Sequence, residues 1–331
     1  MRILIVILGA VMLSACDQAP ALNDFNEYLT RIANVQDTDA LPAPDEQLQR
    51  LPEKRDVTLP VESLTIGLLD SYELRKCDLF NLIAERNSVL GKVQDGFHRF
   101  DYEVQLLQGL TRCTANPDIS AKLQKQLSDI ETSKRHDLPL HWYNLLYSSN
   151  AMRSQLSSHR WLDNGWDVSQ ITRALDAMAQ IQQALTSQQL AINLPRLTPF
   201  QEVLDKQPLL GDLKYSLDNA TLWLLTIHRQ LADNDQQIIC GPNRNQTKLT
   251  YLRNVFQSYY VEKIQPYLAR LDALYLQLAP SLNMFEQQEP SRYYFAIEES
   301  HQAFRDATRQ HMQYWQQLFQ RCSVQVGNKV Q

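Results

Sequence analysis

The chain reads LLGDLKYSLDNATLWLLTIHRQLA over residues 209–232, and this stretch carries its clearest periodic pattern. A leucine recurs at every seventh position, and further apolar residues fall between the leucines at three- and four-residue spacing. The repeating leucines are Leu210, Leu217, Leu224 and Leu231, and the residues between them are Leu213, Ala220 and Ile227. This pattern predicts a long helix with one buried face. Three heptads are marginal for a coiled coil between two chains, so we expect the helix to be buried within its own bundle.

Helical spacing of apolar residues continues on both sides of this stretch. Glycine is sparse, with 9 in 331 residues, and no Asn-Gly pair stands between two alternating apolar runs, so the signals of β-hairpins are missing. Further helices are expected over residues 21–36, 66–90, 97–113, 118–135, 169–191, 247–283 and 291–322, with an irregular, aromatic-rich stretch between 136 and 168. Together these patterns predict an all-α fold, a multi-helix bundle of antiparallel helical hairpins.

The N-terminus resembles the signal peptide of a bacterial lipoprotein. Arg2 precedes an eleven-residue apolar run, which leads into the sequence Leu-Ser-Ala-Cys ending at Cys16. The run is too short to span a membrane, so we expect it to be removed. Cys16 would then be the new N-terminus, and its sulfur would carry a diacylglycerol. A plain cleaved signal peptide is the alternative.

The two residues after this cysteine indicate which membrane holds the protein. Asp17 and Gln18 resemble the signal that retains lipoproteins in the inner membrane. We therefore expect the protein on the periplasmic side of the inner membrane, with the inner leaflet of the outer membrane as the alternative. Two or three fatty chains, at roughly 0.8 kcal/mol per buried CH₂, make a stable anchor, so the membrane itself is one expected partner.

The sequence divides into three parts. A signal peptide over residues 1–15 is followed by residues 16–61, which hold the lipid anchor, a short amphipathic helix and a connector over 37–61. The connector contains four prolines among charged residues, which excludes a regular helix, so we expect it to be extended and laid over the surface. An all-α domain fills residues 62–331, and its folded body is expected to begin near Leu64.

Four cysteines remain for the folded protein, and thiols pair in the oxidising compartment that an exported protein reaches. They are Cys77, Cys113, Cys240 and Cys322, which allow three pairings. The midpoint between Cys77 and Cys113 falls in the predicted turn of a helical hairpin, so we predict that these two are bridged. The last helix runs back along the preceding one and brings Cys322 to the loop that holds Cys240, which gives the second bridge. No CxxC motif occurs, which disfavours a zinc or thioredoxin-like site.

Charge and motif content exclude several classes of function. The formal net charge is −5 and the basic residues are scattered, so no nucleic-acid partner is expected. Glycine-rich phosphate loops and the HExxH motif are absent, so we expect no cofactor. Glu298 and His301 form one Glu-x-x-His motif, which is half of what a di-iron site needs. Without a second copy we expect no metal, and we interpret His301 and His311 as core or rim histidines.

Four adjacent polar residues close a predicted helix and form a first candidate for a functional site: Glu85, Arg86, Asn87 and Ser88. Facing a cleft, Glu85 could serve as a base and Ser88 as a hydroxyl group. No histidine is placed beside them, so a nucleophilic serine is poorly supported. The alternative is a buried polar network that locks the hairpin, in which Arg86 pairs with Asp101 or Glu103.

Arg253 and Asn254 form the second candidate. They lie on the predicted helix over 247–283, which also contains Pro266. A proline inside a helix removes a backbone donor and should kink it, and a kink can open a pocket. The alternative is a helix that bends to wrap its core.

Two blocks of sequence are similar to a known family. Residues 77–92, CDLFNLIAERNSVLGK, form the first block, and the second contains Arg-Asn-Val-Phe over 253–256, Tyr260 and Gln-Pro-Tyr-Leu over 265–268. Both resemble an uncharacterised family of Gram-negative lipoproteins, known as domain of unknown function 3080, over roughly residues 24–280. The resemblance implies an envelope lipoprotein and supplies no activity.

The sequence therefore favours a lipid-anchored periplasmic protein that is not catalytic. On this hypothesis, a helical surface holds an envelope protein partner or a ligand. The alternative is a small-molecule binder or hydrolase-type enzyme with a cleft near Glu85, Arg86, Asn87 and Arg253. A purely structural spacer is a third interpretation.

Overall fold

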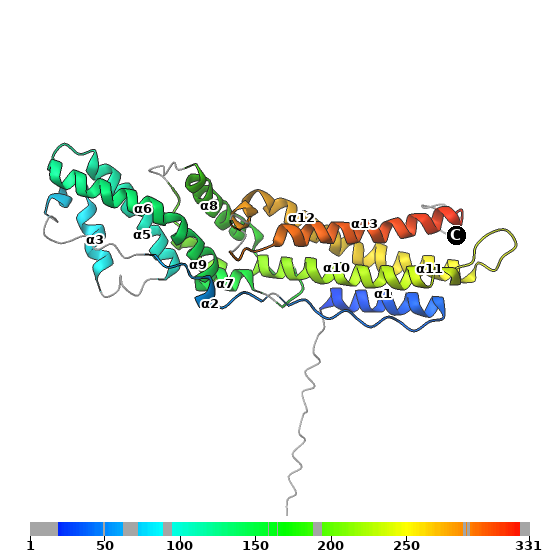
Figure 1. The fold of residues 1–331 in the computed structure, drawn as a ribbon. Coiled ribbons are helices and arrows are strands. Elements are labelled where there is room, and N and C mark those ends of the chain that lie inside the picture. Colours follow the sequence, from blue (N-terminus) through cyan, green and yellow to red (C-terminus); the bar gives the residue numbers. More distant parts are fainter. Residues whose placement is uncertain are drawn as a thin grey trace, which may run out of the picture.

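A computed structural model describes residues 19–324, except residues 49, 62–71, 89–94, 158, 164, 188–193, 287, 288, 290 and 291. Within these ranges the chain is helical or irregular, with no β-strand, which confirms the predicted all-α fold. The molecule is elongated, with α3, α5 and α6 at one end, α11 near the other, and α7, α8 and α9 between (Figure 1). None of the described helices is both long and apolar enough to cross a bilayer.

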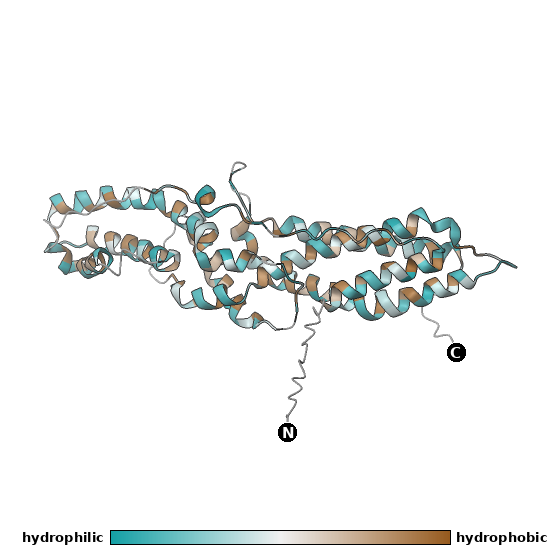
Figure 2. Ribbon diagram, turned by 90° about the horizontal axis from the view of Figure 1, so that it is seen from below, coloured by the Kyte–Doolittle hydropathy of each residue, from teal (hydrophilic) through white to brown (hydrophobic). Residues whose placement is uncertain are grey.

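The α-helices of the described chain are α1 (Pro20–Gln36), α2 (Lys54–Val57), α3 (Leu79–Asn87), α5 (Gly96–Thr114), α6 (Ala121–Ser148), α7 (Asn150–Leu156), α8 (Val168–Thr186), α9 (Gln201–Lys206), α10 (Leu209–Asp233), α11 (Thr247–Val255), α12 (Gln265–Leu282) and α13 (Ile297–Arg321). Short 3₁₀ helices are η2 (Glu73–Cys77), η3 (Thr198–Phe200), η4 (Asp235–Gln237) and η6 (Asn283–Phe285), and η5 (Phe256–Ile264) is a π-helix. The long helices are hydrophobic on one side and hydrophilic on the other (Figure 2).

The predicted heptad helix is α10. It lies at the centre of a helical bundle, which we call the larger bundle. Every leucine of its seven-residue repeat is fully buried. The helix packs against α1, α7, α12 and α13, all from the same chain, so burial within its own bundle is confirmed.

The helix α1 belongs to this bundle. Phe25, Tyr28 and Ile32 have no exposed surface, and the Phe25 ring stacks on Trp223 of α10 with the ring centres 6.0 Å apart. The packed body therefore includes α1, and the expectation that it begins near Leu64 is wrong. The reason is that the apolar face of α1 is wide enough to fill a groove beside α10 and η5.

The connector runs back along the bundle from the end of α1 (Figure 1). It is not helical in its described residues up to Glu53, as predicted, but Lys54–Val57 form the short helix α2, which the sequence did not predict. Side-chain amides of the helices hold its backbone. The Asn219 amide accepts a hydrogen bond from the N–H of Gln47 at 2.8 Å and donates to its carbonyl at 3.3 Å. Asn144 makes the same pair of bonds with Leu59, at 2.7 and 2.9 Å, and Gln230 accepts from a third backbone N–H. These amides supply the partners that an extended backbone otherwise lacks.

The helices α5 and α6 pack against each other, and α6 is longer than expected. The predicted end near residue 135 is wrong, since α6 continues to Ser148 through Pro139, and α7 follows at once. Pro139 removes one helical hydrogen bond, but the aromatic residues after it bury their side chains, with Trp142 packing against Phe100 at 5.2 Å between ring centres. Tertiary packing thus overrides the local penalty. The predicted helix over 66–90 is described only as η2 and α3.

The chain also differs from expectation around Pro266. In place of a kink inside one α-helix, the π-helix η5 comes first and Pro266 stands in the first turn of α12. The N–H of Gln265 bonds to the carbonyl of Tyr260, five residues earlier, so the wider π register persists up to the proline. Proline has no N–H to offer and needs space beside the preceding turn, which explains the wider turns before it.

Both predicted disulfides are present. Cys77 is bridged to Cys113, and Cys240 is bridged to Cys322, with a Cα–Cα distance of 5.3 Å in each pair. The hairpin argument and the antiparallel course of the last helices therefore give the right pairing. Two disulfides are consistent with an oxidising location outside the cytoplasm.

Candidate binding cavity

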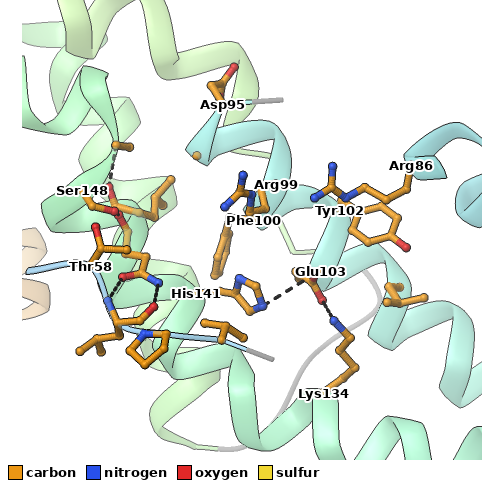
Figure 3. A pocket seen from close by; sticks show the side chains of 18 of the residues that line it. Thr58, Arg86, Asp95, Arg99, Phe100, Tyr102, Glu103, Lys134, His141 and Ser148 are labelled. Atoms are coloured by element: carbon orange, nitrogen blue, oxygen red, sulfur yellow. Dashed lines mark hydrogen bonds and ion pairs between the residues drawn. The ribbon is translucent and has the colours of Figure 1, made fainter. Parts of the chain in front are cut away.

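A cavity of about 700 Å³ opens between α3, α5, α6 and the end of the connector (Figure 3). This volume is in the range of small-molecule sites. Four separate stretches of chain line it, so it exists only in the folded protein. Its walls combine apolar side chains such as Ile83, Phe100 and Leu145 with several charged groups.

The wall between α5 and α6 contains a buried group of three residues, which we call the polar triad: Glu103, Lys134 and His141. The Lys134 ammonium donates to Glu103 Oε2 at 2.9 Å, and the two side chains are 8% and 7% exposed. The other carboxylate oxygen lies 3.7 Å from Nε2 of His141, which has no hydrogen-bond partner although it is buried. Burial lowers the pKa of His141, and this effect outweighs the attraction of Glu103.

Two arginines also line the cavity. The Arg86 guanidinium lies over the ring of Tyr102, 5.6 Å from its centre. Burial, and then the nearby Glu103 carboxylate, raise the pKa of Tyr102 to about 12, so the phenol stays neutral. The Arg99 guanidinium forms no hydrogen bond or ion pair with any residue that the structure describes. Figure 3 shows the guanidinium ends of Arg86 and Arg99 directed into the same part of the cavity.

Asp95 is the second acid of the cavity wall, and its charge is already engaged. It caps the N-terminus of α5, where its side chain accepts hydrogen bonds from the N–H groups of Phe97 and His98 at 2.7 and 3.1 Å. Its other oxygen lies 2.7 Å from Nδ1 of His98. Partial burial raises the pKa of this carboxyl, but the hydrogen bonds from His98 and Phe97 together lower it further, so the net shift is downward.

The hydroxyl groups of the cavity wall also have partners. Thr58 donates to the carbonyl of Lys54 at 2.7 Å. Ser148 and Ser149 donate to carbonyls one turn earlier in α6, at 2.7 and 2.6 Å. None of these three hydroxyls is bonded to a histidine, which is the arrangement that activates a serine nucleophile.

Of the first candidate cluster, Arg86 and Asn87 line the cavity, whereas Glu85 and Ser88 are exposed on α3 outside its lining. Both acids that the sequence offered as partners of Arg86 form other contacts. Glu103 pairs with Lys134, and Asp101 accepts bonds from the backbone N–H groups of Leu197 and Thr198, both at 2.9 Å. The described contacts of Asp101 and Glu103 are thus made with other residues, and the network predicted around Arg86 stays a prediction.

The cleft predicted between Arg86 and Arg253 does not form. Arg253 and Asn254 lie on α11, toward the end of the molecule opposite to α3 (Figure 1). Asn254 is exposed, and Arg253 is half-buried. The spacing of residues along two helices could not reveal that the fold places Arg86 and Arg253 toward opposite ends of the molecule. Cys16, Asp17 and Gln18 lie outside the described residues.

Sequence reasoning missed Arg99 and two members of the polar triad. Lys134 and His141 follow Leu127 at seven-residue intervals and continue its buried stripe on α6. A charged residue on an apolar stripe is the signal that could have revealed them. This signal was not recognised, because the predicted helix ended before His141 and the stripe therefore was not followed that far.

The remaining histidines of interest lie in the larger bundle. His301 bonds through Nε2 to Asp272 at 2.7 Å and stacks on Tyr275. His311 is fully buried, its Nε2 accepts from the Trp315 indole at 3.2 Å, and its Nδ1 has no partner. Throughout the described ranges, no group of three or more His, Cys, Asp or Glu side chains could hold a metal ion.

Fold and cavity together define the chain as an elongated, disulfide-braced, all-helical protein with a ligand-sized polar cavity. Residues 25–326 match the family described as Protein of unknown function (DUF3080), so the chain belongs to this family. No curated protein and no solved structure matches the chain.

Proposed function

We propose that this protein is a lipid-anchored binding component of the Gram-negative cell envelope, that it is not catalytic, and that the cavity is its binding site. The observation that carries the proposal is the cavity of about 700 Å³ with a buried, charged wall. Burying an ion pair costs free energy that an apolar wall would not cost, so a wall of this kind is better explained by binding than by stability.

The location follows from the N-terminus. The sequence up to Cys16 has the features of a lipoprotein signal, and residues 17 and 18 favour the periplasmic side of the inner membrane over the outer membrane. The two disulfides support an oxidising compartment. Radiolabelled palmitate should be incorporated by the wild type and not by Cys16→Ala. Equal labelling of both proteins would refute the anchor.

The absence of catalysis is supported by the state of the hydroxyl groups. Thr58, Ser148 and Ser149 are engaged by backbone carbonyls, and the nearest acid to His141 is committed to Lys134. A binding protein needs the cavity and its charges but no activated nucleophile.

Native mass spectrometry of protein isolated from envelopes tests the binding site. A small molecule should remain bound to the wild type and be missing from Asn87→Trp, in which an indole fills the mouth of the cavity. Glu85→Trp is the matched control, because Glu85 is exposed on the same helix outside the cavity. If all three proteins are free of small molecules and cross-linking in cells captures one envelope protein on each, the site is wrong and the scaffold form of the hypothesis replaces it.

A further inference from the structure

We infer that the protein lies lengthwise on the bilayer that holds its lipid, with the exposed side of α1 kept against the phospholipid headgroups by a short tether. This inference rests on the proposed function, because it takes the lipid on Cys16 from it. It adds how the folded body is placed on the membrane. It follows from the length of chain before α1, from the packing of α1, and from the position of α1 in the molecule.

The chain between the lipid and the first helix is very short. Only residues 17–19 separate Cys16 from Pro20, the first residue of α1. Even fully extended, this chain spans at most about 14 Å between the Cα atoms of those two residues. The headgroup layer of one leaflet is about 5–8 Å thick, so it takes up about half of that span. The start of α1 therefore lies at the surface of the bilayer.

The tether cannot be lengthened by unwinding α1, because this helix belongs to the packed body. Phe25 has no exposed surface, and its ring stacks on Trp223 of α10. Closer to the start of the helix, Asp24 forms an ion pair with Lys263 of η5 at 3.2 Å, and Leu22 packs against the core. Unwinding the first two turns would break these contacts. The whole body is therefore held as close to the membrane as α1 is.

The place of attachment determines how the body is oriented. The helix α1 lies at the edge of the elongated molecule, begins near the middle of its length and runs toward the end that holds α11 (Figure 1). With 17 residues this helix is about 26 Å long. An inclination of more than about 30° would push its C-terminal end through the headgroups, and the opposite inclination would push the end that holds α3 into the bilayer. The long axis must therefore lie close to the plane of the membrane.

The exposed side of α1 is compatible with headgroups. The charges of Glu27 and Arg31 cancel, and most of its other side chains are amides or hydroxyls, which can bond to lipid phosphate and carbonyl groups. None of its side chains is large and apolar, so the contact is with the headgroups and not with the hydrocarbon. The seven residues that form this side are Pro20, Asn23, Asn26, Glu27, Thr30, Arg31 and Asn34.

Attraction to the lipids does not hold this side in place. The connector runs back beside α1 and carries exposed acids such as Asp39 and Asp45, and the whole chain carries −5 (Figure 1). Anionic lipids repel such charges. The short tether is therefore what keeps α1 on the bilayer, and a longer tether should release it.

Fluorescence quenching of the acylated protein in vesicles of phosphatidylethanolamine and phosphatidylglycerol tests the orientation. Two disulfides and the lipid occupy all five cysteines, so one added cysteine can be labelled. Asn26→Cys and Asn34→Cys place the dye on the exposed side of α1, and Gln310→Cys, on α13 beyond α10, is the matched control. With a quencher on the headgroups, we expect quenching at both α1 positions to be at least about fivefold stronger than at Gln310, because two helix layers of about 8–10 Å each lie between them.

A longer tether supplies the second variant. A flexible linker of about 20 glycine and serine residues, inserted after Gln18, has a mean span of about 25 Å and leaves the sorting residues unchanged. Quenching at Asn26 and Asn34 should then fall to the level measured at Gln310.

Three results would overturn the inference. Equal quenching at all three positions would show that the body has no fixed side toward the bilayer, and quenching at Asn26 without quenching at Asn34 would show that it stands upright. Unchanged quenching with the longer linker would show that the tether does not hold α1 in place. In each case, palmitate on Cys16 leaves the proposed function intact. If Cys16 carries no lipid, the anchor and the inference fail together.

Discussion

At the scale of single residues, Glu103 and Lys134 are the most costly pair in the cavity wall. Moving a charged group out of water costs several kcal/mol of solvation free energy. The attraction between the two charges offsets this cost only when the geometry of the pair is good. The 2.9 Å contact supplies that geometry for one carboxylate oxygen, while the other faces His141 at 3.7 Å. The pair is thus stable only as a unit.

Removing one member of this pair should therefore cost more than removing both. Lys134→Met leaves an uncompensated carboxylate in the wall, and we expect it to lower the free energy of unfolding by about 3–5 kcal/mol. The double variant Lys134→Met with Glu103→Leu should recover most of this loss. Urea unfolding of the two proteins gives the comparison. A double variant as unstable as the single one would show that the charges are not coupled.

His311 gives the fold a dependence on pH. Burial, and then the neighbouring His228, lower the pKa of His311 to about 3, whereas an unfolded histidine titrates near about 6.5. Between these values the unfolded chain binds more protons than the folded one. The stability from neutral His311 is therefore complete above about pH 6.5 and is lost as the pH falls toward about 3.

Replacing His311 should flatten this dependence. The free energy of unfolding of the wild type should fall by up to about 1.4 kcal/mol per pH unit more steeply than that of His311→Phe between about pH 6 and pH 4. Denaturant unfolding across this range measures both slopes. Met312→Leu, a change without a titratable group in the same helix, should keep the slope of the wild type. Parallel curves for His311→Phe and the wild type would contradict the assignment.

At the scale of elements, hydrophobic periodicity predicted α10, α5 and α13 well, because each buries one continuous face of a regular helix. It failed in α6, since the local penalty of Pro139 is decided by aromatic packing elsewhere in the fold. Nor could it find the amides that hold the connector. Asn219 and Gln230 interrupt the apolar face of α10, and their partners are 172 and 189 residues away in the sequence.

These amides should control how easily the connector detaches. Asn144→Ala and Asn219→Ala each leave a backbone N–H and a backbone carbonyl of the connector without their hydrogen-bond partner. Local opening of the connector should therefore become more frequent. We expect trypsin to cut after Arg50 and Arg55 about tenfold faster in either variant. Asn254→Ala, an exposed change on α11, is the control. An unchanged rate of cleavage would mean that packing alone holds the connector.

At the scale of the whole molecule, the two disulfides brace its two ends. The bridge from Cys77 ties η2 to α5, and the bridge from Cys240 ties the end of α13 to the loop before α11. Their pairing was predictable because it depends on the course of neighbouring helices. The cavity was not predictable, because it forms between α3, α5, α6 and the end of the connector, which reaches this part of the molecule after running along α10. Spacing along one helix carries no information about such an assembly.

The bridges also connect stability with compartment. Protein exported with its signal should show linked peptides for Cys77 with Cys113 and for Cys240 with Cys322. The same chain without residues 1–15, made in the cytosol, should have five free thiols, those of the four bridge cysteines and of Cys16. Each missing bridge lowers the free energy of unfolding by about 2–4 kcal/mol, so the cytosolic form should unfold at clearly lower denaturant concentration. Non-reducing peptide maps and urea titrations of both forms decide the matter. Free thiols in the exported protein would remove the main structural support for an envelope location.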